Sequence, residues 1–167
     1  MTAQHTQGMD HVWSPWRYDY IASGGKTSSQ CVFCIGDDVS RDAELLVLFR
    51  GVHNFVILNL FPYLPGHFMV APYAHTAIFD EAPSVQLTEM MELAQQGMRA
   101  LKAIYKPEGF NLGMNLGHCA GAGIREHFHL HVVPRWTGDA NFMGITGDTR
   151  VLPEELPVTY GRMKEVF

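Results

Sequence analysis

Three histidines alternate with apolar residues late in the chain, where His127, His129 and His131 are separated by Phe128 and Leu130. Successive side chains of a β-strand point to opposite faces, so the three imidazoles are expected to share one face, roughly 6.6 Å apart. An isolated strand histidine is usually a packing residue, but three at strict alternation predict a chemical site. Imidazole can serve there as a nucleophile, a proton donor or a metal ligand.

A glycine-rich segment, Gly117–Gly123, lies just before these histidines and reads GHCAGAG. Small residues allow backbone N–H groups to approach a phosphate closely. Such a loop is usually only a turn when it stands alone. Its position directly before the histidines favours a phosphate-binding loop.

Cys31 and Cys34 form a C-x-x-C pair far upstream. This spacing is typical of half of a structural zinc site. It is also compatible with a reducible pair or with two small buried residues, and the residues alone leave these alternatives open. The third cysteine, Cys119, has no evident partner, and we assign it no role.

Composition limits the class of protein. The chain has 167 residues, of which 47% are apolar, and this suggests one domain with its own core. The net charge is −5 and no run of Lys or Arg occurs, which argues against a nucleic-acid partner. No apolar stretch approaches the length of a membrane span, and residues 1–10 lack the apolar core of a signal peptide. We therefore expect a cytoplasmic protein with no membrane partner.

The elements that must position the histidines follow from periodicity. Apolar residues recur at spacings of three and four over residues 84–105, which predicts one long helix with Ser84 as its cap. Pro134 is expected to close the histidine strand. The order of elements predicts an α+β fold with an antiparallel sheet and a short terminal helix. The strands are expected at 45–49, 54–60, 67–71, 110–116 and 128–133.

The histidine segment resembles the signature of the histidine triad (HIT) superfamily, in which two apolar residues follow the last histidine. The resemblance extends over residues 31–136 and includes Asn59, Pro65-Gly66-His67, Val70-Ala71-Pro72 and His75. It implies a HIT-like fold, a five-stranded antiparallel sheet with one long helix. We expect a HIT domain at 31–143, an N-terminal extension at 1–30 that packs on it, and a C-terminal extension at 144–167.

A closer resemblance is to the bacterial HIT branch that includes diadenosine tetraphosphate phosphorylases. The segments that carry it are Trp13–Arg17, Cys31–Cys34, Asn115–Gly123 and His131–Met143.

The resemblance implies a role for each matching residue. His129 would attack the α-phosphorus of a nucleotide and form a covalent nucleotidyl-histidine, with His131 as proton donor and His127 as the third catalytic histidine. Nucleotide binding would fall to Asn59 at the ribose and to Asn115, Gly121 and Gly123. His67 is expected to be structural or substrate-adjacent.

The resemblance also implies a structural zinc ion. Some superfamily members complete the two-cysteine half-site with two histidines, and the matching set here is Cys31, Cys34, His75 and His127. A closed site of this kind leaves no position for a reactive water.

The expected activity is cleavage of a dinucleoside polyphosphate, with phosphate or water as the acceptor. Alternatives are hydrolysis of nucleoside phosphoramidates or adenylylated lysine, a nucleotide-binding interaction module with little catalysis, and a metalloenzyme with zinc on all three histidines. By analogy with the family, we expect a homodimer that pairs the long helix and the fourth strand.

Overall fold

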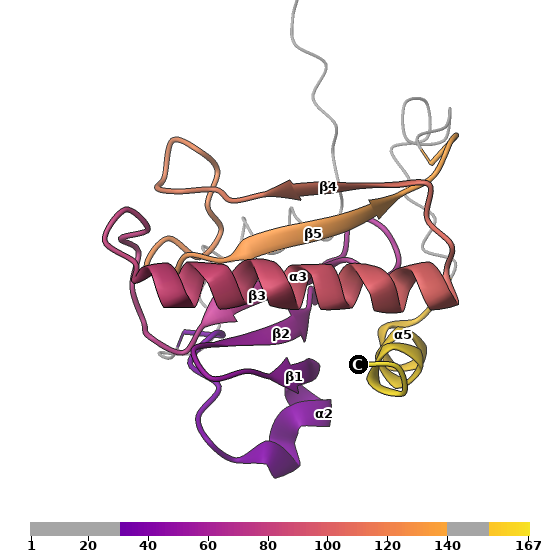
Figure 1. The fold of residues 1–167 in the computed structure, drawn as a ribbon, viewed down its shortest axis with the longest axis horizontal. Coiled ribbons are helices and arrows are strands. Elements are labelled where there is room, and N and C mark those ends of the chain that lie inside the picture. The colour runs from indigo at the N-terminus through magenta and orange to yellow at the C-terminus, as the bar shows by residue number, and fades with distance from the viewer. Residues whose placement is uncertain (1–30, 140–153) are drawn as a thin grey trace, which may run out of the picture.

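The computed structural model describes residues 31–139 and 154–167 (Figure 1). The N-terminal extension, including Trp13–Arg17, and the segment Asn141–Met143 lie outside the described residues. The elements are η1 (Val39–Arg41), α2 (Asp42–Leu45), β1 (Val47–Arg50), β2 (Asn54–Leu58), β3 (Phe68–Pro72), α3 (Ser84–Ile104), β4 (Gly109–Gly113), β5 (Leu130–Arg135) and α5 (Leu156–Lys164).

The strands form one five-stranded sheet in the order β1-β2-β3-β5-β4, and every neighbouring pair is antiparallel. The long helix α3 crosses one face of this sheet, and α5 lies beside the β1 end (Figure 1). The prediction of an α+β fold with five antiparallel strands, one long helix and a short terminal helix is therefore confirmed.

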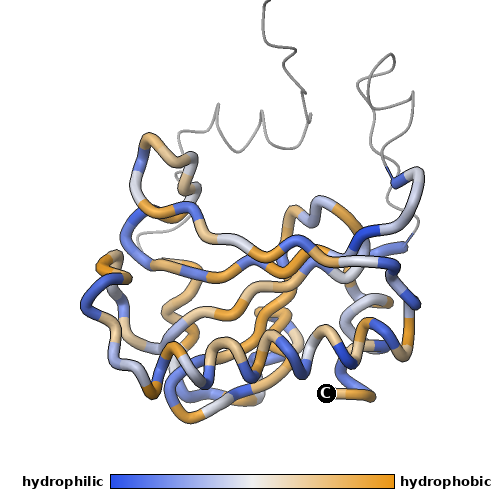
Figure 2. The backbone as a smooth tube through the Cα atoms, turned by 45° about the horizontal axis from the view of Figure 1, so that its top comes forward, coloured by the Kyte–Doolittle hydropathy of each residue, from blue (hydrophilic) through white to orange (hydrophobic). Residues whose placement is uncertain are grey.

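Alternation along the strands divides the core into two clusters, because successive side chains point to opposite faces. Figure 2 shows apolar residues along the central strands, whereas many of the connecting loops are hydrophilic. The cluster on the helix-covered face includes Val56, Leu58, Phe68, Val70, Phe128, Leu130 and Val132 from the sheet side. The cluster on the opposite face consists of Phe33, Ile35, Val47, Phe55, Ile57, Met69 and Ala71.

Helix α3 packs closely on the sheet because Gly97 has no side chain. A Cβ atom at Gly97 would lie 2.4 Å from Cζ of Phe68, so the glycine allows the phenyl ring of β3 to contact the helix backbone. The expectation that Ser84 caps α3 is wrong. Ser84 is already the first helical residue, and the N-cap position belongs to Pro83, which makes no side-chain capping bond.

The predicted strand bounds need correction around the histidines. Strand β5 begins at Leu130, so only His131 lies within it, and His127 and His129 precede it. The reason is a change of pairing partner, since the N–H of Phe128 donates to the carbonyl of Thr76, beyond the end of β3. Alternation of the side chains nevertheless continues through this extended segment.

Pro134 lies inside β5 rather than after it, opposite Phe110 of β4. The pairing of β5 with β3 ends at Val132. On that side of β5, Pro134 therefore has no neighbouring strand, and its missing N–H group costs no hydrogen bond. The other errors in the predicted strands concern their first and last residues. Residues 45 and 46 precede β1, β2 stops at Leu58, and β4 stops at Gly113.

Helix α5 closes the β1 end of the sheet. Met163 is fully buried in the helix-side cluster, and Nζ of Lys164 donates to the carbonyl of Leu48 at 2.8 Å. The described part of the C-terminal extension thus packs against the sheet. Within residues 31–139 and 154–167, no helix has both the length and the apolar character that crossing a bilayer requires.

Candidate functional site

The three predicted histidines do come together on the sheet face opposite α3. The ring centroids of His129 and His131 are 4.8 Å apart, and Phe128 and Leu130 between them belong to the helix-side core. The shared face expected from alternation is therefore present, although only His131 belongs to a strand. Each ring is held by a different partner, and these partners distinguish the chemistry of the three histidines.

His129 is held as a neutral imidazole with one defined tautomer. Its Nδ1 lies 2.9 Å from the carbonyl oxygen of His127, an atom that can only accept, so Nδ1 carries the proton and Nε2 keeps a lone pair. The side chain is only 5% exposed, and this burial lowers the pKa of His129 below its ordinary value. A neutral ring with an unprotonated Nε2 is the form that a nucleophile requires.

His131 has a different neighbour. Its Nδ1 lies 3.0 Å from Nε2 of His67, a fully buried residue directly before β3. The ring of Tyr63 is tilted by 32° against the His67 ring at a centroid distance of 4.8 Å, and it is stacked on the His131 ring at 6.3 Å. This arrangement ties the last histidine of the row to the turn before β3.

His127 has partners at both ring nitrogens. Nε2 lies 2.8 Å from the carbonyl oxygen of Pro72, and Nδ1 lies 3.5 Å from Sγ of Cys31. Burial, only partly offset by the bond to Pro72, lowers the pKa of His127. Because the Nε2 proton is fixed on a carbonyl, Nδ1 presents a lone pair toward the cysteines. This geometry favours the metal-ligand role of His127 over the catalytic role.

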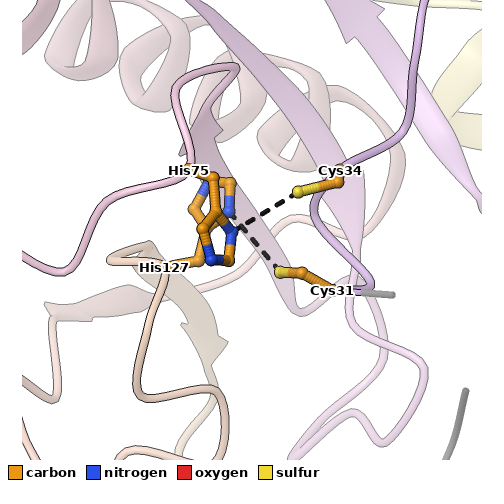
Figure 3. Close-up of side chains that lie close together, drawn as sticks. All are labelled: Cys31, Cys34, His75 and His127. Carbon is orange, nitrogen blue, oxygen red and sulfur yellow. Dashed lines mark hydrogen bonds between the residues drawn. The ribbon is translucent and has the colours of Figure 1, made fainter. Parts of the chain in front are cut away.

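Figure 3 shows Cys31, Cys34, His75 and His127 converging from separate segments of the chain. Sγ of Cys34 lies 3.4 Å from Nδ1 of His75, and the four potential ligand atoms all lie within 4.8 Å of one another. Nε2 of His75 faces the carboxylate of Glu126 at 3.9 Å. Among the described residues, this is the only group of this kind with metal-ligand geometry.

The cluster fits a tetrahedral zinc ion. Zinc bonds of about 2.0–2.1 Å to nitrogen and about 2.3 Å to sulfur place neighbouring ligands roughly 3.3–3.8 Å apart. The two sulfur–nitrogen distances of 3.4 and 3.5 Å lie within that range. The bond from His127 to the Pro72 carbonyl is also the usual outer partner of a metal-bound histidine. Zinc held by four protein ligands supports structure and offers no open position for catalysis.

Sequence reasoning missed Phe33, which lies between the two cysteines. Its ring is 4.6 Å from the His129 ring and 5.3 Å from the His127 ring, and its side chain is only 2% exposed. The segment that carries the cysteines therefore covers the central histidine. An apolar residue between two predicted ligands was the only available signal, and it did not identify the partner.

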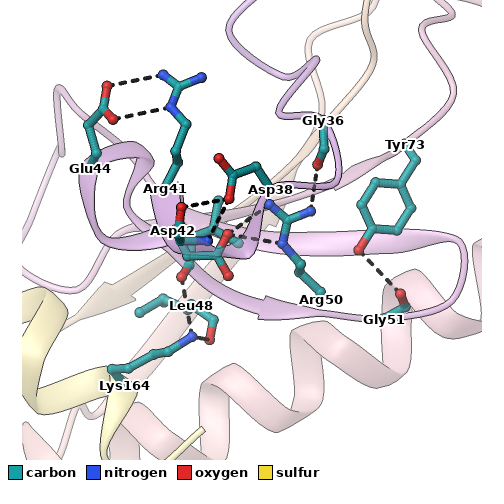
Figure 4. Close-up of polar contacts among 12 residues, drawn as sticks. Gly36, Asp38, Arg41, Asp42, Glu44, Leu48, Arg50, Gly51, Tyr73 and Lys164 are labelled. Atoms are coloured by element: carbon teal, nitrogen blue, oxygen red, sulfur yellow. Dashed lines mark hydrogen bonds and ion pairs between the residues drawn. The ribbon is translucent and has the colours of Figure 1, made fainter.

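The same segment is anchored at its other end by Arg50 of β1 (Figure 4). The Arg50 guanidinium donates to the carbonyl of Gly36 at 2.6 Å and forms two bonds to Oδ1 of Asp42, at 2.7 and 3.0 Å. This ion pair is half-buried. Residues 31–36 are thus held between a salt bridge and the Cys/His cluster, which stabilises Phe33 on the histidine face.

The glycine loop forms a tight turn, as predicted. Gly117 and Gly121 have φ of +81° and +83°, a region that favours glycine. The amide of Gly121 donates to the carbonyl of His118 at 3.1 Å, so in this conformation it belongs to the turn. The contribution of Gly121 and Gly123 to phosphate binding remains a prediction.

A pocket of about 280 Å³ lies beside His131. The predicted nucleotide-binding residue Asn115 lines it together with Tyr63, Asn111 and residues of β4. A larger pocket of about 380 Å³ lies between the β1–β2 turn and α3, and none of its lining residues belongs to the histidine row. We locate the candidate site beside the smaller pocket because His131 and Asn115 line it.

Asn59 lies directly after β2 and next to His67. Its Nδ2 is 3.3 Å from Nδ1 of His67, and its Oδ1 accepts from the N–H of Phe61 at 3.0 Å. Both ends of the amide thus contact the turn before β3. The expected contact of Asn59 with a ribose stays a prediction.

Comparison with known proteins gives one family and several relatives. The HIT domain family matches residues 41–138. A protein named AP-4-A phosphorylase from Mycobacterium tuberculosis is 39% identical over 155 residues, which cover 89% of this chain and 79% of that protein.

Among solved structures, a zinc-bound histidine triad family protein from Mycobacterium smegmatis superimposes with a TM-score of 0.64 at 26% identity. The match covers 84% of this chain and 94% of that chain. A diadenosine triphosphate hydrolase from Plasmodium falciparum has a TM-score of 0.59 at 16% identity, covering 84% of each chain, and supports the fold alone.

Proposed function

Because this chain belongs to the HIT family, we propose that it is a nucleotidyl hydrolase or transferase that cleaves a dinucleoside polyphosphate through His129. The observation that carries the proposal is the state of His129. A buried, neutral ring whose Nδ1 proton is fixed on the carbonyl of His127 leaves Nε2 as a nucleophile. The similarity to a protein named AP-4-A phosphorylase supports diadenosine tetraphosphate as the substrate.

The proposed reaction has two displacements. Nε2 of His129 attacks an α-phosphorus, a P–N bond forms, and the P–O bond to the leaving ATP breaks as His131 donates a proton to the leaving oxygen. Phosphate or water then attacks the same phosphorus, the P–N bond breaks, and the acceptor's proton returns to His131. With phosphate the second product is ADP, and with water it is AMP.

Product analysis tests this proposal. Diadenosine tetraphosphate is incubated with and without inorganic phosphate, using the wild type, His129→Ala and His53→Ala. His53 lies exposed in the turn between β1 and β2 and is a matched histidine control. ATP plus ADP only with phosphate indicates a phosphorylase, and ATP plus AMP without phosphate indicates a hydrolase.

His129→Ala is expected to lose turnover in either case, whereas His53→Ala keeps it. Full activity of His129→Ala would overturn the covalent route. No turnover by the wild type would reject this substrate and favour the alternative activities, hydrolysis of nucleoside phosphoramidates or of adenylylated lysine. Tight nucleotide binding without turnover of any of these substrates would favour an interaction module.

We also propose that Cys31, Cys34, His75 and His127 hold one structural zinc ion. The fit of the cluster and the similarity to a zinc-bound relative support this. Metal analysis is expected to give one zinc per chain, lost in Cys31→Ser/Cys34→Ser and retained in Cys119→Ser, whose thiol is exposed and free. Zinc retained without both cysteines would instead favour the three-histidine metalloenzyme.

Domain limits, oligomeric state and location remain proposals. We propose a HIT domain at 31–143 between extensions at 1–30 and 144–167, in a cytoplasmic protein that binds a small nucleotide rather than nucleic acid. A homodimer is supported by β4, an edge strand in this sheet on which Leu112 is 41% exposed. Sedimentation of the wild type and Leu112→Arg tests this, with a monomeric wild type as the contradicting result.

A further inference from the structure

The two sides of the Cys/His cluster are covered to different extents. His127 is fully buried, with its Nε2 2.8 Å from the Pro72 carbonyl, and Cys31 beside it is half-buried. Cys34 is exposed, and the side chain of its neighbour His75 is 44% exposed. Oxidation of a cysteine depends on the access of the oxidant to its sulfur. A small oxidant in solution therefore reaches Sγ of Cys34 more readily than Sγ of Cys31.

The two sulfur atoms are placed so that they can also bind each other. All four potential ligand atoms, including both Sγ atoms, lie within 4.8 Å of one another. The N–H of Cys34 donates to the carbonyl of Cys31 at 3.0 Å, which closes a four-residue turn. Such a turn brings its first and last Cα atoms to less than about 7 Å. A disulfide bond accepts Cα separations of about 4.4–6.8 Å, so this turn is compatible with one.

A disulfide bond at this place would hold the chain in a different way from a zinc ion. Through zinc, the cluster joins the segment 31–36 to His127, which lies 96 positions after Cys31. A bond between Cys31 and Cys34 closes only the turn between them and leaves both histidines unattached. A cross-link over a long stretch of chain restricts it more than a local one. Oxidation would therefore replace a long-range cross-link with a local one.

The segment that would lose this cross-link covers part of the histidine row. Phe33 lies between the two cysteines, is only 2% exposed, and contacts the rings of His127 and His129. At the other end of the segment, the Arg50 guanidinium donates to the carbonyl of Gly36 at 2.6 Å. Loss of the cluster thus loosens the end that carries Phe33, whereas the end at Gly36 stays attached.

We propose that Cys31 and Cys34 are a site of oxidative modification, where a hydroperoxide converts the zinc-binding thiolates into a disulfide and loosens Phe33 from the histidine row. This modification rests on the zinc site proposed above and on no catalytic activity. The C-x-x-C pair then has both of the roles that its spacing allows, one in each redox state.

The reaction balances with hydrogen peroxide as the oxidant. Sγ of Cys34 attacks one oxygen, the O–O bond breaks, and Cys34 becomes a sulfenic acid as hydroxide leaves. Sγ of Cys31 then attacks Sγ of Cys34, the S–S bond forms, and a second hydroxide leaves. Two thiolates lose two electrons, one peroxide is reduced to two hydroxide ions, and the zinc ion loses two of its four ligands. A dithiol reverses the oxidation, and added zinc restores the cluster.

The first test follows zinc and the disulfide during a peroxide titration of the zinc-loaded wild type and Cys119→Ser. Cys119→Ser removes the third cysteine of the chain, so an equal result in both proteins excludes a bond to Cys119. Bound zinc is counted before peroxide is added, and released zinc is measured with a chromogenic chelator. Mass spectrometry of tryptic peptides measures the disulfide. We expect one zinc released for each Cys31–Cys34 disulfide, and recovery of bound zinc with dithiothreitol and added zinc.

The second test measures the loosening of the segment by amide hydrogen exchange. Backbone exchange in residues 31–36 is expected to become at least about tenfold faster after oxidation, because the segment opens locally more often without its cross-link. Helix α3 crosses the opposite face of the sheet and provides the internal reference (Figure 1). Its exchange should not change, because the oxidised pair does not contribute to the packing of that face.

Three results would overturn the proposal. These are zinc that stays bound while Cys119 is oxidised, zinc release with a sulfinic acid in place of the disulfide, and unchanged exchange in residues 31–36 after the disulfide has formed. A protein that binds no zinc before peroxide is added would contradict the zinc site itself, and the proposed modification would be wrong with it. None of these measurements uses a nucleotide, so they are independent of the proposed nucleotidyl activity.

Discussion

The two faces of the sheet are covered in different ways. On one face α3 and α5 seal a cluster whose buried members are all apolar, from Leu48 through Phe68 to Met163. On the other face, among residues 31–139 and 154–167, the short segment 31–36 covers the histidines, and Phe33 is its central apolar contact. Polar contacts hold that segment, namely the Cys/His cluster and the bonds from Arg50 to Gly36 and Asp42.

This difference shows why the chemistry lies where it does. A helix-covered face excludes water, whereas on the other face of the described structure His127 and His129 are buried beneath a short segment and a pocket lies beside His131. The helix face should therefore determine stability, and the histidine face should determine activity. The predictions below test that division, beginning with the largest expected effect.

Phe68→Ala should weaken the helix face most. The ring is fully buried against Gly97 of α3, and removing it leaves a cavity below the helix. We expect a loss of about 3–5 kcal/mol in the free energy of unfolding, measured by urea denaturation. The kcat of the molecules that remain folded should change little, because the Phe68 ring belongs to the helix-side cluster and the histidines lie on the opposite face.

A double-mutant cycle adds a control for the close contact between the ring and the helix. Gly97→Ala should destabilise the wild type, because the new Cβ meets the Phe68 ring, and should be much less harmful in Phe68→Ala. Met91→Ala, at an exposed position of the same helix, should change the free energy of unfolding little. Strictly additive effects of Gly97→Ala and Phe68→Ala would show that the ring and the helix are not coupled.

Phe33→Ala should lower activity as well as stability, in contrast to Phe68→Ala. We expect the free energy of unfolding to fall by about 3 kcal/mol. This is the lower end of the range for a buried phenylalanine, because a short segment can collapse into the space that the ring leaves. Since the ring contacts both His127 and His129, kcat should fall even where the protein is fully folded. The adjacent Val32 is half-exposed, so Val32→Ala provides the control. Neither its free energy of unfolding nor its kcat should change. An unchanged kcat for folded Phe33→Ala would mean that the cover does not position His129.

How much of the fold and of the site could be predicted from the sequence depends on how far apart the interacting residues lie along the chain. The shared face of His127, His129 and His131 follows from a local period of two and holds even outside the strand. The strand limits were wrong because they depend on pairing partners, such as the Thr76 carbonyl that takes the Phe128 amide.

Contacts between distant segments could not be derived from spacing. The convergence of the C-x-x-C pair with His75 and His127 was implied only by the family resemblance. His67 was expected to be structural or substrate-adjacent, and its bond to His131 spans 64 positions without any local pattern. Phe33 was missed because no local pattern in the sequence indicates a contact that only tertiary packing creates.

Glu89→Gln tests the main charged contact at the border of the helix face. The Glu89 carboxylate accepts from the backbone N–H groups of Val52, His53 and Asn54 at 2.6–2.9 Å and from Nδ2 of Asn54 at 2.8 Å. Gln can accept fewer of these bonds and turns a donor toward the remaining N–H groups. We expect a loss of about 2 kcal/mol in thermal or urea unfolding, within the range for hydrogen bonds to charged groups.

The matched control for that change is Glu92→Gln, one helical turn later and exposed at the same pocket. It should leave the free energy of unfolding nearly unchanged. Neither variant should alter kcat, because the pocket that both residues line is separate from the histidine row. Equal losses for the two variants would attribute the effect to net charge rather than to the hydrogen bonds.

The smallest expected effect is the acid sensitivity that Glu89 contributes. Burial alone would raise the pKa of Glu89, but hydrogen bonds from Val52, His53 and Asn54 outweigh it and hold that pKa below the usual 4.5. Because the folded state binds this proton less readily than the unfolded state, the contribution is present above pH 4.5 and disappears as pH falls through the folded-state pKa. The difference in unfolding free energy between wild type and Glu89→Gln should therefore shrink on going from pH 6 toward pH 3. If the difference stays constant over this pH range, the β1–β2 turn does not hold Glu89 in its charged form. The hydrogen bonds from the turn to α3 would then contribute no charge-dependent stability.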